Sequence, residues 1–212
     1  DLRDKASLLR IFKENKIESV IHLAGFKSVN ESIEAPLSYY NNNINGTITL
    51  LEVMYQFNCK SLIFSSSATV YASSNEMPIS ESAPLAASSP YGSSKLVIER
   101  ILHDLSSSDD DWRISILRYF NPAGAHKSGL IGEAPSGSPN NLFPYILQLI
   151  KGKHKKLKIY GNKFKTKDGT GARDYIHIDD LVDAHVKSLK IIRKKKSEIL
   201  NIGTGKAYTV LE

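Results

Sequence analysis

Hydrophobic positions follow two patterns in the first half of the chain. Short apolar runs, typical of strands buried in a parallel sheet, alternate with longer segments in which apolar residues recur every three or four positions, as in helices. The short runs predict strands at residues 19–24, 61–64 and 113–119. The longer segments predict helices at residues 4–15, 36–57 and 91–105. Because strands and helices alternate with short connections, we predict an α/β fold with a parallel sheet.

The second half of the chain has a different texture. After Asn121 it becomes rich in glycine and proline, and its elements alternate less strictly. Helices are expected at residues 142–150 and 178–192, and short strands at residues 157–160, 174–177 and 199–202. We therefore predict one domain over residues 1–121 and a smaller α/β lobe over residues 122–212, partly interleaved with the first.

The composition is ordinary for a soluble globular protein. Of the 212 residues, 41% are hydrophobic and 24% are charged. No apolar run is long enough to cross a bilayer, and the charged start of the chain does not resemble a secretory signal. We therefore expect a cytoplasmic protein with no membrane partner.

The net charge of +6 comes largely from two basic clusters, at residues 151–158 and 193–196. Neither cluster has the interleaved aromatic residues that stack on bases, so we interpret both as solvated loops and helix ends and expect no nucleic-acid partner. Cys59 is the only cysteine, which excludes an intrachain disulfide. The histidines lack metal-ligand spacing, and we expect no metal site.

Candidate chemistry is concentrated in a serine run and a tyrosine–lysine pair. Ser65, Ser66 and Ser67 follow a predicted strand, and Tyr91 and Lys95 are four residues apart, which places them on one face of a helix. A free tyrosine has a pKa of about 10, but a nearby ammonium favours the phenolate and can lower that value. The arrangement suits removal of a proton from an alcohol, with a serine hydroxyl sharing that proton.

Three segments follow predicted strands and should therefore meet at one edge of the sheet. They are Ala24-Gly25, the serine run, and Phe120-Asn121-Pro122. Ligands of open parallel sheets bind outside the carboxyl ends of the strands. This convergence predicts a single site without reliance on any one motif.

Longer strings then indicate a family. The spacing Y-x-x-x-K with an upstream serine run resembles the extended short-chain dehydrogenase/reductase superfamily, and the full set of strings, in order, resembles its UDP-glucose 4-epimerase family. The matching strings lie at residues 42–47, 64–71, 118–126, 139–142 and 168–177. The resemblance covers essentially the whole chain and implies a Rossmann-like doubly wound sheet with a smaller substrate lobe.

The resemblance also implies an activity. Members of the family use tightly held NAD to epimerise C4 of a UDP-hexose through a 4-keto intermediate, interconverting UDP-glucose and UDP-galactose in galactose metabolism. They act as homodimers, here through the helices that start at Pro36 and Tyr91. The glycine-rich G-x-G-x-x-G loop of dinucleotide-binding folds is absent from this sequence. We therefore interpret the chain as a fragment that lacks the N-terminal and C-terminal parts of proteins of this family. We expect the fragment alone to be inactive.

Catalytic roles are assigned by the resemblance to three residues. Tyr91 would act as base and acid. Lys95 would bind the nicotinamide ribose and lower the pKa of Tyr91. Ser67 would hydrogen-bond the sugar, joined by Thr69. The structural alternatives are a core aromatic for Tyr91, a surface lysine for Lys95 and turn residues for Ser67 and Thr69.

The resemblance also implies which residues contact NAD, from its adenine to its nicotinamide. The residues implied to contact NAD are Asp1, Leu2, Leu23, Ala24, Gly25, Phe26, Lys27, Asn42, Ser67, Tyr91, Lys95 and Phe120. Gly25 allows close approach of the backbone to the pyrophosphate, and Lys27 can meet an anion. The alternative for Lys27 is an exposed loop lysine.

The substrate side draws mostly on the second half of the chain. The residues implied to bind the UDP-sugar are Ser67, Thr69, Tyr91, Asn121, Asn141, Leu142, Tyr160 and Arg173. Arg173 suits the diphosphate because a guanidinium pairs with phosphate oxygens in a bidentate manner. An ion pair with Asp174 is the structural alternative for Arg173, and ordinary packing is the alternative for Leu142 and Tyr160.

Two other functions compete with epimerisation. A nucleotide-sugar 4,6-dehydratase needs an acid and a base beside the serine pair, and Ser67, Ala68 and Thr69 supply no carboxylate. A catalytically idle nucleotide-binding module would not need Ser67, Tyr91 and Lys95 together. Interconversion of UDP-glucose and UDP-galactose would separate the three hypotheses.

Overall fold

A computed structural model describes residues 1–73, 77–133, 139, 141–194 and 197–212. The chain forms two compact units. The first unit contains Asp1–Tyr119 and Ala184–Asn201, and the second contains Phe120–Asp183 and Ile202–Glu212. The chain therefore changes unit at residues 119–120, and residues 184–201 belong with the first unit.

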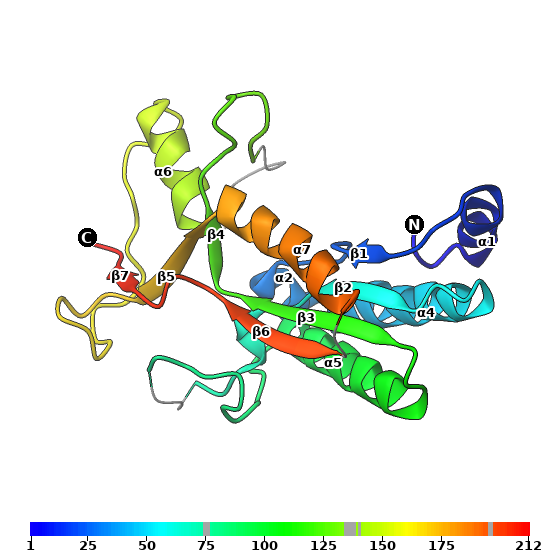
Figure 1. The fold of residues 1–212 in the computed structure, drawn as a ribbon. Coiled ribbons are helices and arrows are strands. Elements are labelled where there is room, and N and C mark those ends of the chain that lie inside the picture. The colour runs from blue at the N-terminus through cyan, green and yellow to red at the C-terminus, as the bar shows by residue number, and fades with distance from the viewer. Residues whose placement is uncertain (74–76, 134–138, 140, 195–196) are drawn as a thin grey trace. The chain divides into compact units, whose positions relative to one another are not determined.

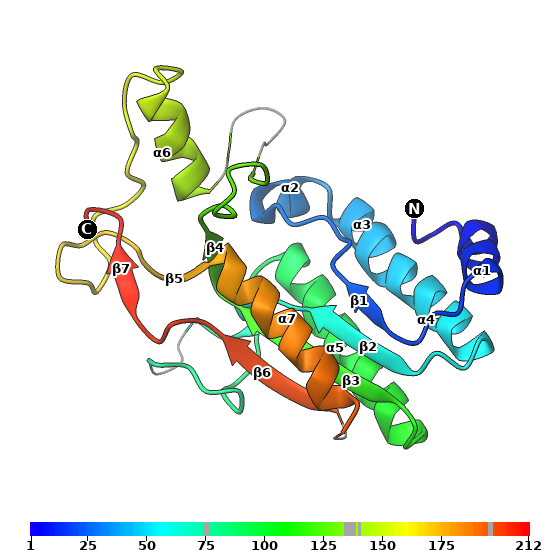
Figure 2. The same cartoon turned by 45° about the horizontal axis from the view of Figure 1, so that its top comes forward.

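The first unit is built on a four-stranded sheet with the order β1-β2-β3-β6. These strands are β1 (Val20–His22), β2 (Ser61–Ser65), β3 (Arg113–Tyr119) and β6 (Glu198–Ile202). β1 pairs with β2, and β2 with β3, in parallel, with Ile63 opposite Ile21 and Ser115. Parallel pairing brings the carboxyl ends of β1 and β2 to the same edge, as the sequence predicted. Figures 1 and 2 show the sheet with helices on both faces.

Helices α1 (Lys5–Glu14), α4 (Gly46–Gln56) and α5 (Pro90–Ser108) cover one face of this sheet. Their apolar faces, with those of β2 and β3, form the core, which includes the fully buried side chains of Val53, Met54, Leu62, Phe64 and Leu102. The part of α7 (Ile178–Ile192) from Ala184 onward lies on the opposite face. Helices on both faces of a parallel sheet make a doubly wound, Rossmann-like arrangement.

Local capping explains where α5 begins, which decides the position of Tyr91. Ser89 has an extended backbone, and its hydroxyl accepts a hydrogen bond from the Gly92 amide at 3.2 Å. Pro90 follows at the first helical position, where its missing N–H costs nothing. Tyr91 is therefore fixed in the first turn of a capped helix, with Lys95 one turn further on.

The helix predicted at residues 36–57 is interrupted internally. It consists of α3 (Pro36–Tyr39), a π-helical segment (Tyr40–Asn45) and α4. π-helical turns widen the backbone and often occur at functional sites. Apolar spacing does not reveal such a segment because its flanks keep the helical period.

The second unit contains a three-stranded sheet with the order β4-β5-β7. Its elements are β4 (Asn121–Ala123), α6 (Leu142–Ile150), β5 (Ala172–His177) and β7 (Ala207–Thr209). β4 and β5 are parallel, and β5 and β7 are antiparallel. The strand predicted at residues 157–160 is wrong: this segment has no strand structure, and Ile159 and Tyr160 are exposed.

The sequence interpretation also missed short elements, including α2 (Val29–Glu34), β4 and β7. None of the helices that the structure describes is long and apolar enough to cross a membrane.

Candidate active site

The serine run, Tyr91 and Lys95 meet at the carboxyl end of β2. Ser67 Oγ accepts hydrogen bonds from the Thr69 amide at 3.2 Å and from Thr69 Oγ1 at 3.0 Å. Its own proton is left free to donate to the Tyr91 hydroxyl, which lies beside Ser67. Lys95 Nζ donates to the Ser65 carbonyl oxygen at 2.8 Å. The structure thus brings Ser67, Thr69, Tyr91 and Lys95 together.

Burial dominates the electrostatics of this cluster. It raises the pKa of Tyr91 to about 12, against the hydrogen bond from Ser67, which lowers it. It lowers the pKa of Lys95 to about 8, against the nearby charge of Glu99, which raises it. The expectation that Lys95 brings the pKa of Tyr91 below its ordinary value is not met in this structure. The physical reason is that the sequence shows the ammonium but not the loss of water around the phenol.

The segment after β1 is held by a side chain that the sequence analysis did not select. Asn43, in the π-helical segment, accepts from the Phe26 amide at 2.8 Å and donates to the Phe26 carbonyl at 3.1 Å. The same amide group donates to Ser94 Oγ on α5 at 3.1 Å. Asn42, the predicted residue, donates to Asn43 Oδ1 at 3.0 Å. Asn43 therefore ties the predicted cofactor loop to the catalytic helix.

Gly25 lies in the space between these residues. A Cβ atom at Gly25 would be 3.2 Å from Asn43 Oδ1 and 3.8 Å from Lys95 Nζ. The absent side chain leaves an open approach to the backbone beside Lys95, which is what a bound dinucleotide phosphate or ribose requires. The residues present fit NAD on this observation.

The remaining predicted cofactor residues of the first unit are less enclosed. Leu23, Ala24, Phe26 and Lys27 are exposed. Asp1, also exposed, forms an ion pair with Arg3 at 2.6 Å, and Leu2 packs against the core cluster.

A second cluster of polar side chains surrounds Ser65, the residue whose carbonyl oxygen binds Lys95. Ser65 Oγ and His185 Nε2 are 2.7 Å apart, and Tyr119 lies beside Ser65. Burial raises the pKa of Tyr119. His185 and Tyr119 were not selected from sequence. The signal available was the position of Tyr119 beside the predicted Phe120.

The predicted substrate residues other than Ser67, Thr69 and Tyr91 lie in the second unit, together with Phe120. Asn121 Nδ2 donates to the Asp174 carbonyl at 3.2 Å. Asp174 Oδ2 accepts from the Thr204 and Gly205 amides at 2.9 and 2.8 Å, so its carboxylate faces the 204–205 loop. Arg173 is exposed, and its Nη1 donates to the Ala172 carbonyl at 2.9 Å.

The structure does not gather the other predicted substrate residues. Asn141 and Leu142 stand at the start of α6, and Asn141 is exposed. Tyr160 is 83% exposed. Among the described residues, Tyr160 makes no hydrogen bond or ring contact with Asn141 or Arg173, so their joint role in binding stays a prediction.

A parallel, doubly wound sheet with Ser, Tyr and Lys at the carboxyl end of a central strand defines a Rossmann-like protein of the short-chain dehydrogenase/reductase class. Within that class, the chain belongs to the NAD dependent epimerase/dehydratase family, whose family model matches residues 1–203.

Curated relatives narrow the similarity. The chain is 55% identical over 214 residues to UDP-glucose 4-epimerase 2 of Arabidopsis thaliana, matching 100% of this chain and 61% of that protein. It is 51% identical over 213 residues to UDP-glucose 4-epimerase of Bacillus subtilis, matching 100% of this chain and 63% of that protein. The chain therefore spans less than two thirds of the length of these relatives.

Solved structures agree with the fold. UDP-glucose-4-epimerase from Stenotrophomonas maltophila, with bound NAD and formylated UDP-arabinopyranose, is 46% identical with a TM-score of 0.97, covering 100% of this chain and 63% of that one. UDP-glucose 4-epimerase from Bifidobacterium longum, in complex with NAD+ and UDP, is 50% identical with a TM-score of 0.96, covering 100% and 64%.

Proposed function

We propose that this chain carries the acid–base centre of a UDP-glucose 4-epimerase, which interconverts UDP-glucose and UDP-galactose through a 4-keto sugar. The observation that carries the proposal is the placement of Ser67 and Tyr91 beside Lys95 at the end of β2, in a chain that is 50% or more identical to several UDP-glucose 4-epimerases. The same similarity favours a cytoplasmic enzyme of galactose metabolism.

NAD is the cofactor that the proposal requires. When bound, it supplies the hydride acceptor and donor for C4. The chain's part is to hold it: Gly25 and Lys27 on the pyrophosphate side, Asn42 and Lys95 on the ribose side, and Phe120 against the nicotinamide. Asp1 and Leu2 would contact the adenine, and Leu23, Ala24 and Phe26 complete the strand-end segment.

Tyr91 is the proposed base and acid for the sugar 4-hydroxyl. A base must reach its phenolate form, which burial disfavours and the hydrogen bond from Ser67 favours. Lys95 is the cation available to stabilise that form. We therefore expect the pKa of Tyr91 in the working enzyme to lie well below about 12.

Binding of the UDP-sugar is proposed for the residues that the family resemblance implies. Ser67 and Thr69 would bind sugar hydroxyls, and Asn121 and Asn141 would bind polar groups of the substrate. Arg173 would pair with the diphosphate, since its guanidinium is exposed and the Asp174 carboxylate is occupied by the 204–205 loop. Leu142 and Tyr160 would line the uracil pocket.

The test uses a chimaera in which residues 1–212 replace the matching part of the Bacillus subtilis relative. We expect it to interconvert the two UDP-sugars, and Tyr91→Phe to lower kcat by about 10²- to 10⁴-fold. Tyr55→Phe, at an exposed tyrosine of α4, is the matched control and should leave kcat unchanged. A chimaera that makes a dehydrated sugar, or a Tyr91→Phe variant with full activity, would refute the proposal.

The chain alone provides a second test. Because the sequence lacks a G-x-G-x-x-G loop to hold the pyrophosphate, we propose that residues 1–212 bind NAD weakly and do not turn over. Calorimetric titration with NAD should give no tight binding. Submicromolar binding would contradict this.

Homodimerisation is proposed through the helices starting at Pro36 and Tyr91. Their outer faces carry exposed apolar side chains, among them Leu37 at 81% exposure and Val97 at 42%. Sedimentation of the chimaera should give a dimer, and Leu37→Glu should weaken it.

A further inference from the structure

Three residues of α5 contact three consecutive residues at the end of β2. Tyr91 lies beside Ser67, which lowers the pKa of its hydroxyl, and Lys95 Nζ donates to the Ser65 carbonyl at 2.8 Å. Glu99 completes the row, because Ser66 Oγ donates to Glu99 Oε1 at 2.5 Å. Positions 91, 95 and 99 are one turn apart and share a face of the helix. We call this set of contacts the serine zipper.

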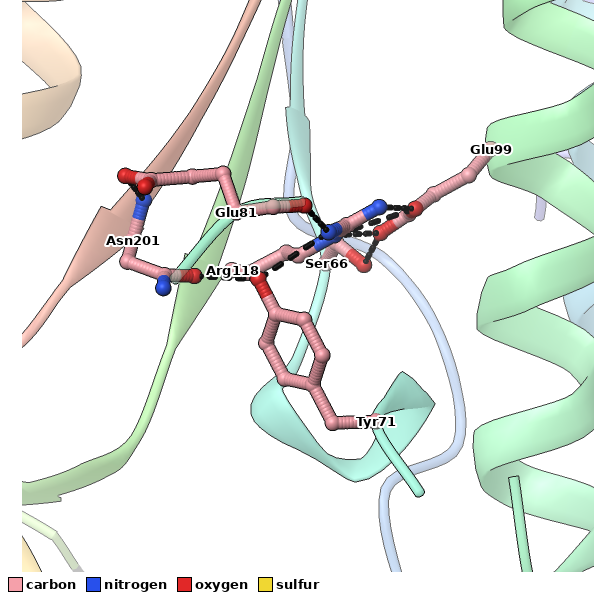
Figure 3. A network of polar contacts seen from close by, with 6 residues as sticks. All are labelled: Ser66, Tyr71, Glu81, Glu99, Arg118 and Asn201. Atoms are coloured by element: carbon pink, nitrogen blue, oxygen red, sulfur yellow. Dashed lines mark hydrogen bonds and ion pairs between the residues drawn. The ribbon is translucent and has the colours of Figure 1, made fainter. Parts of the chain in front are cut away.

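Glu99 is also held by a side chain of β3. Arg118, on β3, donates from Nε to both carboxylate oxygens at 3.0 and 3.1 Å and from Nη2 to Oε2 at 2.6 Å. Glu99 and Arg118 are 5% and 2% exposed. Figure 3 shows the carboxylate of Glu99 facing both the guanidinium and Ser66.

The guanidinium also reaches away from the zipper. Arg118 Nη1 donates to Tyr71 Oη and to the Glu81 carbonyl, each at 3.0 Å. Tyr71 Oη in turn donates to Asn201 Oδ1 at 2.6 Å (Figure 3). The network thus has a near arm, through Glu99 to Ser66, and a far arm, through Tyr71 to Asn201.

We propose that Glu99 is a positioning residue for the reaction: held by Arg118, it sets the register between the serine run and α5 through its hydrogen bond to Ser66, and so places Ser67 against Tyr91. The inference rests on the proposed epimerase function and deepens it. Glu99 touches neither Tyr91 nor Ser67. It acts through Ser66, the neighbour of Ser67.

The physical basis is the directionality of a buried, charge-assisted contact. Such hydrogen bonds are short and strong, and a buried carboxylate that loses a partner cannot turn to water instead. Tyr91 and Ser67 each have neutral hydroxyls, which rotate freely and fix a register less firmly. A displacement of about 1 Å between a catalytic group and its partner can cost about 10²-fold in rate.

The decisive variant is Ser66→Ala, which removes the near arm and leaves the Glu99–Arg118 pair intact. Ser115→Ala is its matched control: Ser115 is also fully buried, lies on β3, and donates to a glutamate, Glu198, at 3.3 Å. In the chimaera we expect Ser66→Ala to lower kcat by about 10-fold or more while KM for UDP-galactose changes less than twofold. Ser115→Ala should leave kcat within twofold.

The far arm provides the second comparison. Tyr71→Phe removes the link to Asn201 and should lower the melting temperature, with kcat within twofold of wild type. A merely structural network would instead make kcat follow stability in all three variants. Equal kcat for Ser66→Ala and Ser115→Ala, or parallel losses across the series, would overturn the inference.

A readout independent of activity separates this inference from the proposed function. Hydrogen exchange on the 212-residue chain should show faster exchange at residues 66–69 in Ser66→Ala than in Ser115→Ala. Equal exchange overturns the zipper even if the chimaera is active. An inactive wild-type chimaera refutes the proposed function and the catalytic role of Glu99 with it, whereas the exchange difference would still establish the zipper.

Discussion

The two units prepare their functional residues in opposite ways. In the first, Ser67, Tyr91 and Lys95 are buried together, and Lys95 is already bonded to the end of β2. In the second, Arg173 and Tyr160 are exposed, and the neighbouring Asp174 carboxylate accepts hydrogen bonds from the 204–205 loop. The difference teaches that packing within the chain already positions the acid–base residues. The proposed substrate-binding residues Arg173 and Tyr160 are instead exposed to solvent. Variants in the first unit should therefore change stability and kcat, and variants in the second should change mainly KM.

Lys95→Met should give the largest effect, and in opposite directions for stability and activity. A pKa of about 8 in place of 10.5 corresponds to about 3 kcal/mol against the charged lysine in the folded state. Below pH 8 both states carry the proton and the full cost is present. Between about pH 8 and 10.5 only the unfolded state stays charged, so wild-type stability rises with pH. Lys95→Met should therefore be more stable than wild type by about 2–3 kcal/mol at pH 7, and by less at pH 9.5.

Urea unfolding of the 212-residue chain at pH 7 and pH 9.5 measures this difference. Lys13→Met, at an exposed lysine of α1, is the control and should change stability by less than about 0.5 kcal/mol at either pH. In the chimaera, Lys95→Met should lose activity although it is more stable. If Lys95→Met is less stable than wild type, burial of the charged lysine does not lower the stability of the folded state. The contrast between the two units would then disappear.

Asp174→Ala should give the next largest effect. It tests whether the Asp174 carboxylate holds the 204–205 loop of the second unit in place. The carboxylate accepts hydrogen bonds from the Thr204 amide and hydroxyl and from the Gly205 amide. Their loss should lower stability by about 1–2 kcal/mol. A Cβ on Gly203 would be only 2.9 Å from Phe120 Cδ2, so the loop also packs on Phe120. KM should therefore rise more than kcat falls.

Thr204→Val separates the contributions of these hydrogen bonds. It removes the Thr204 hydroxyl and keeps the backbone amides of Thr204 and Gly205. It should cost about half as much stability as Asp174→Ala, measured by urea unfolding. If the two variants cost the same, the amides contribute nothing, and Asp174 does not organise the loop in the manner inferred here.

Gly92→Ala examines how tightly the first unit is packed. A Cβ at Gly92 would be 2.8 Å from the Thr69 carbonyl oxygen and 3.1 Å from the Ala87 Cβ, closer than either can tolerate without movement. We expect a loss of about 1–2 kcal/mol, although alanine is intrinsically the better helix former. Gly132→Ala, where the nearest atom would be 3.6 Å away, is the control and should cost less. Equal losses of stability in the two variants would mean that the first unit accommodates an added methyl group as easily as the second unit does.

Much of the first unit could be predicted from sequence because it depends on periodicity. The strands β2 and β3 and the helix α5 were found within three residues of their observed ends. The π-helical segment could not be found, since Asn41, Asn42 and Asn43 look alike and only the widened backbone decides which amide points to Phe26. The row 91, 95, 99 was present in the sequence as a spacing of four, and a wider search along α5 would have included Glu99.

The failures in the second unit have another cause. Leu157, Ile159 and their neighbours alternate as a half-buried strand does, but a strand exists only when another strand pairs with it, and the sequence does not show partners. β4 and β7 are each only three residues long, too short for alternation to be read. The direction of the Tyr91 pKa was missed because burial is a property of the packed fold.

Tyr160→Ala should have the smallest effect on stability and is the sharpest test of the comparison. The side chain is 83% exposed, so its removal should change the free energy of unfolding by less than about 0.5 kcal/mol. If Tyr160 lines the uracil pocket, its ring contributes contact area only when the nucleotide is bound, and KM should rise about 10-fold with kcat within twofold. Tyr208→Ala, at another exposed tyrosine of the second unit, is the control and should change neither. An unchanged KM would remove Tyr160 from the substrate grip, while a loss of stability would show that the second unit is packed around its binding residues as the first is around Tyr91.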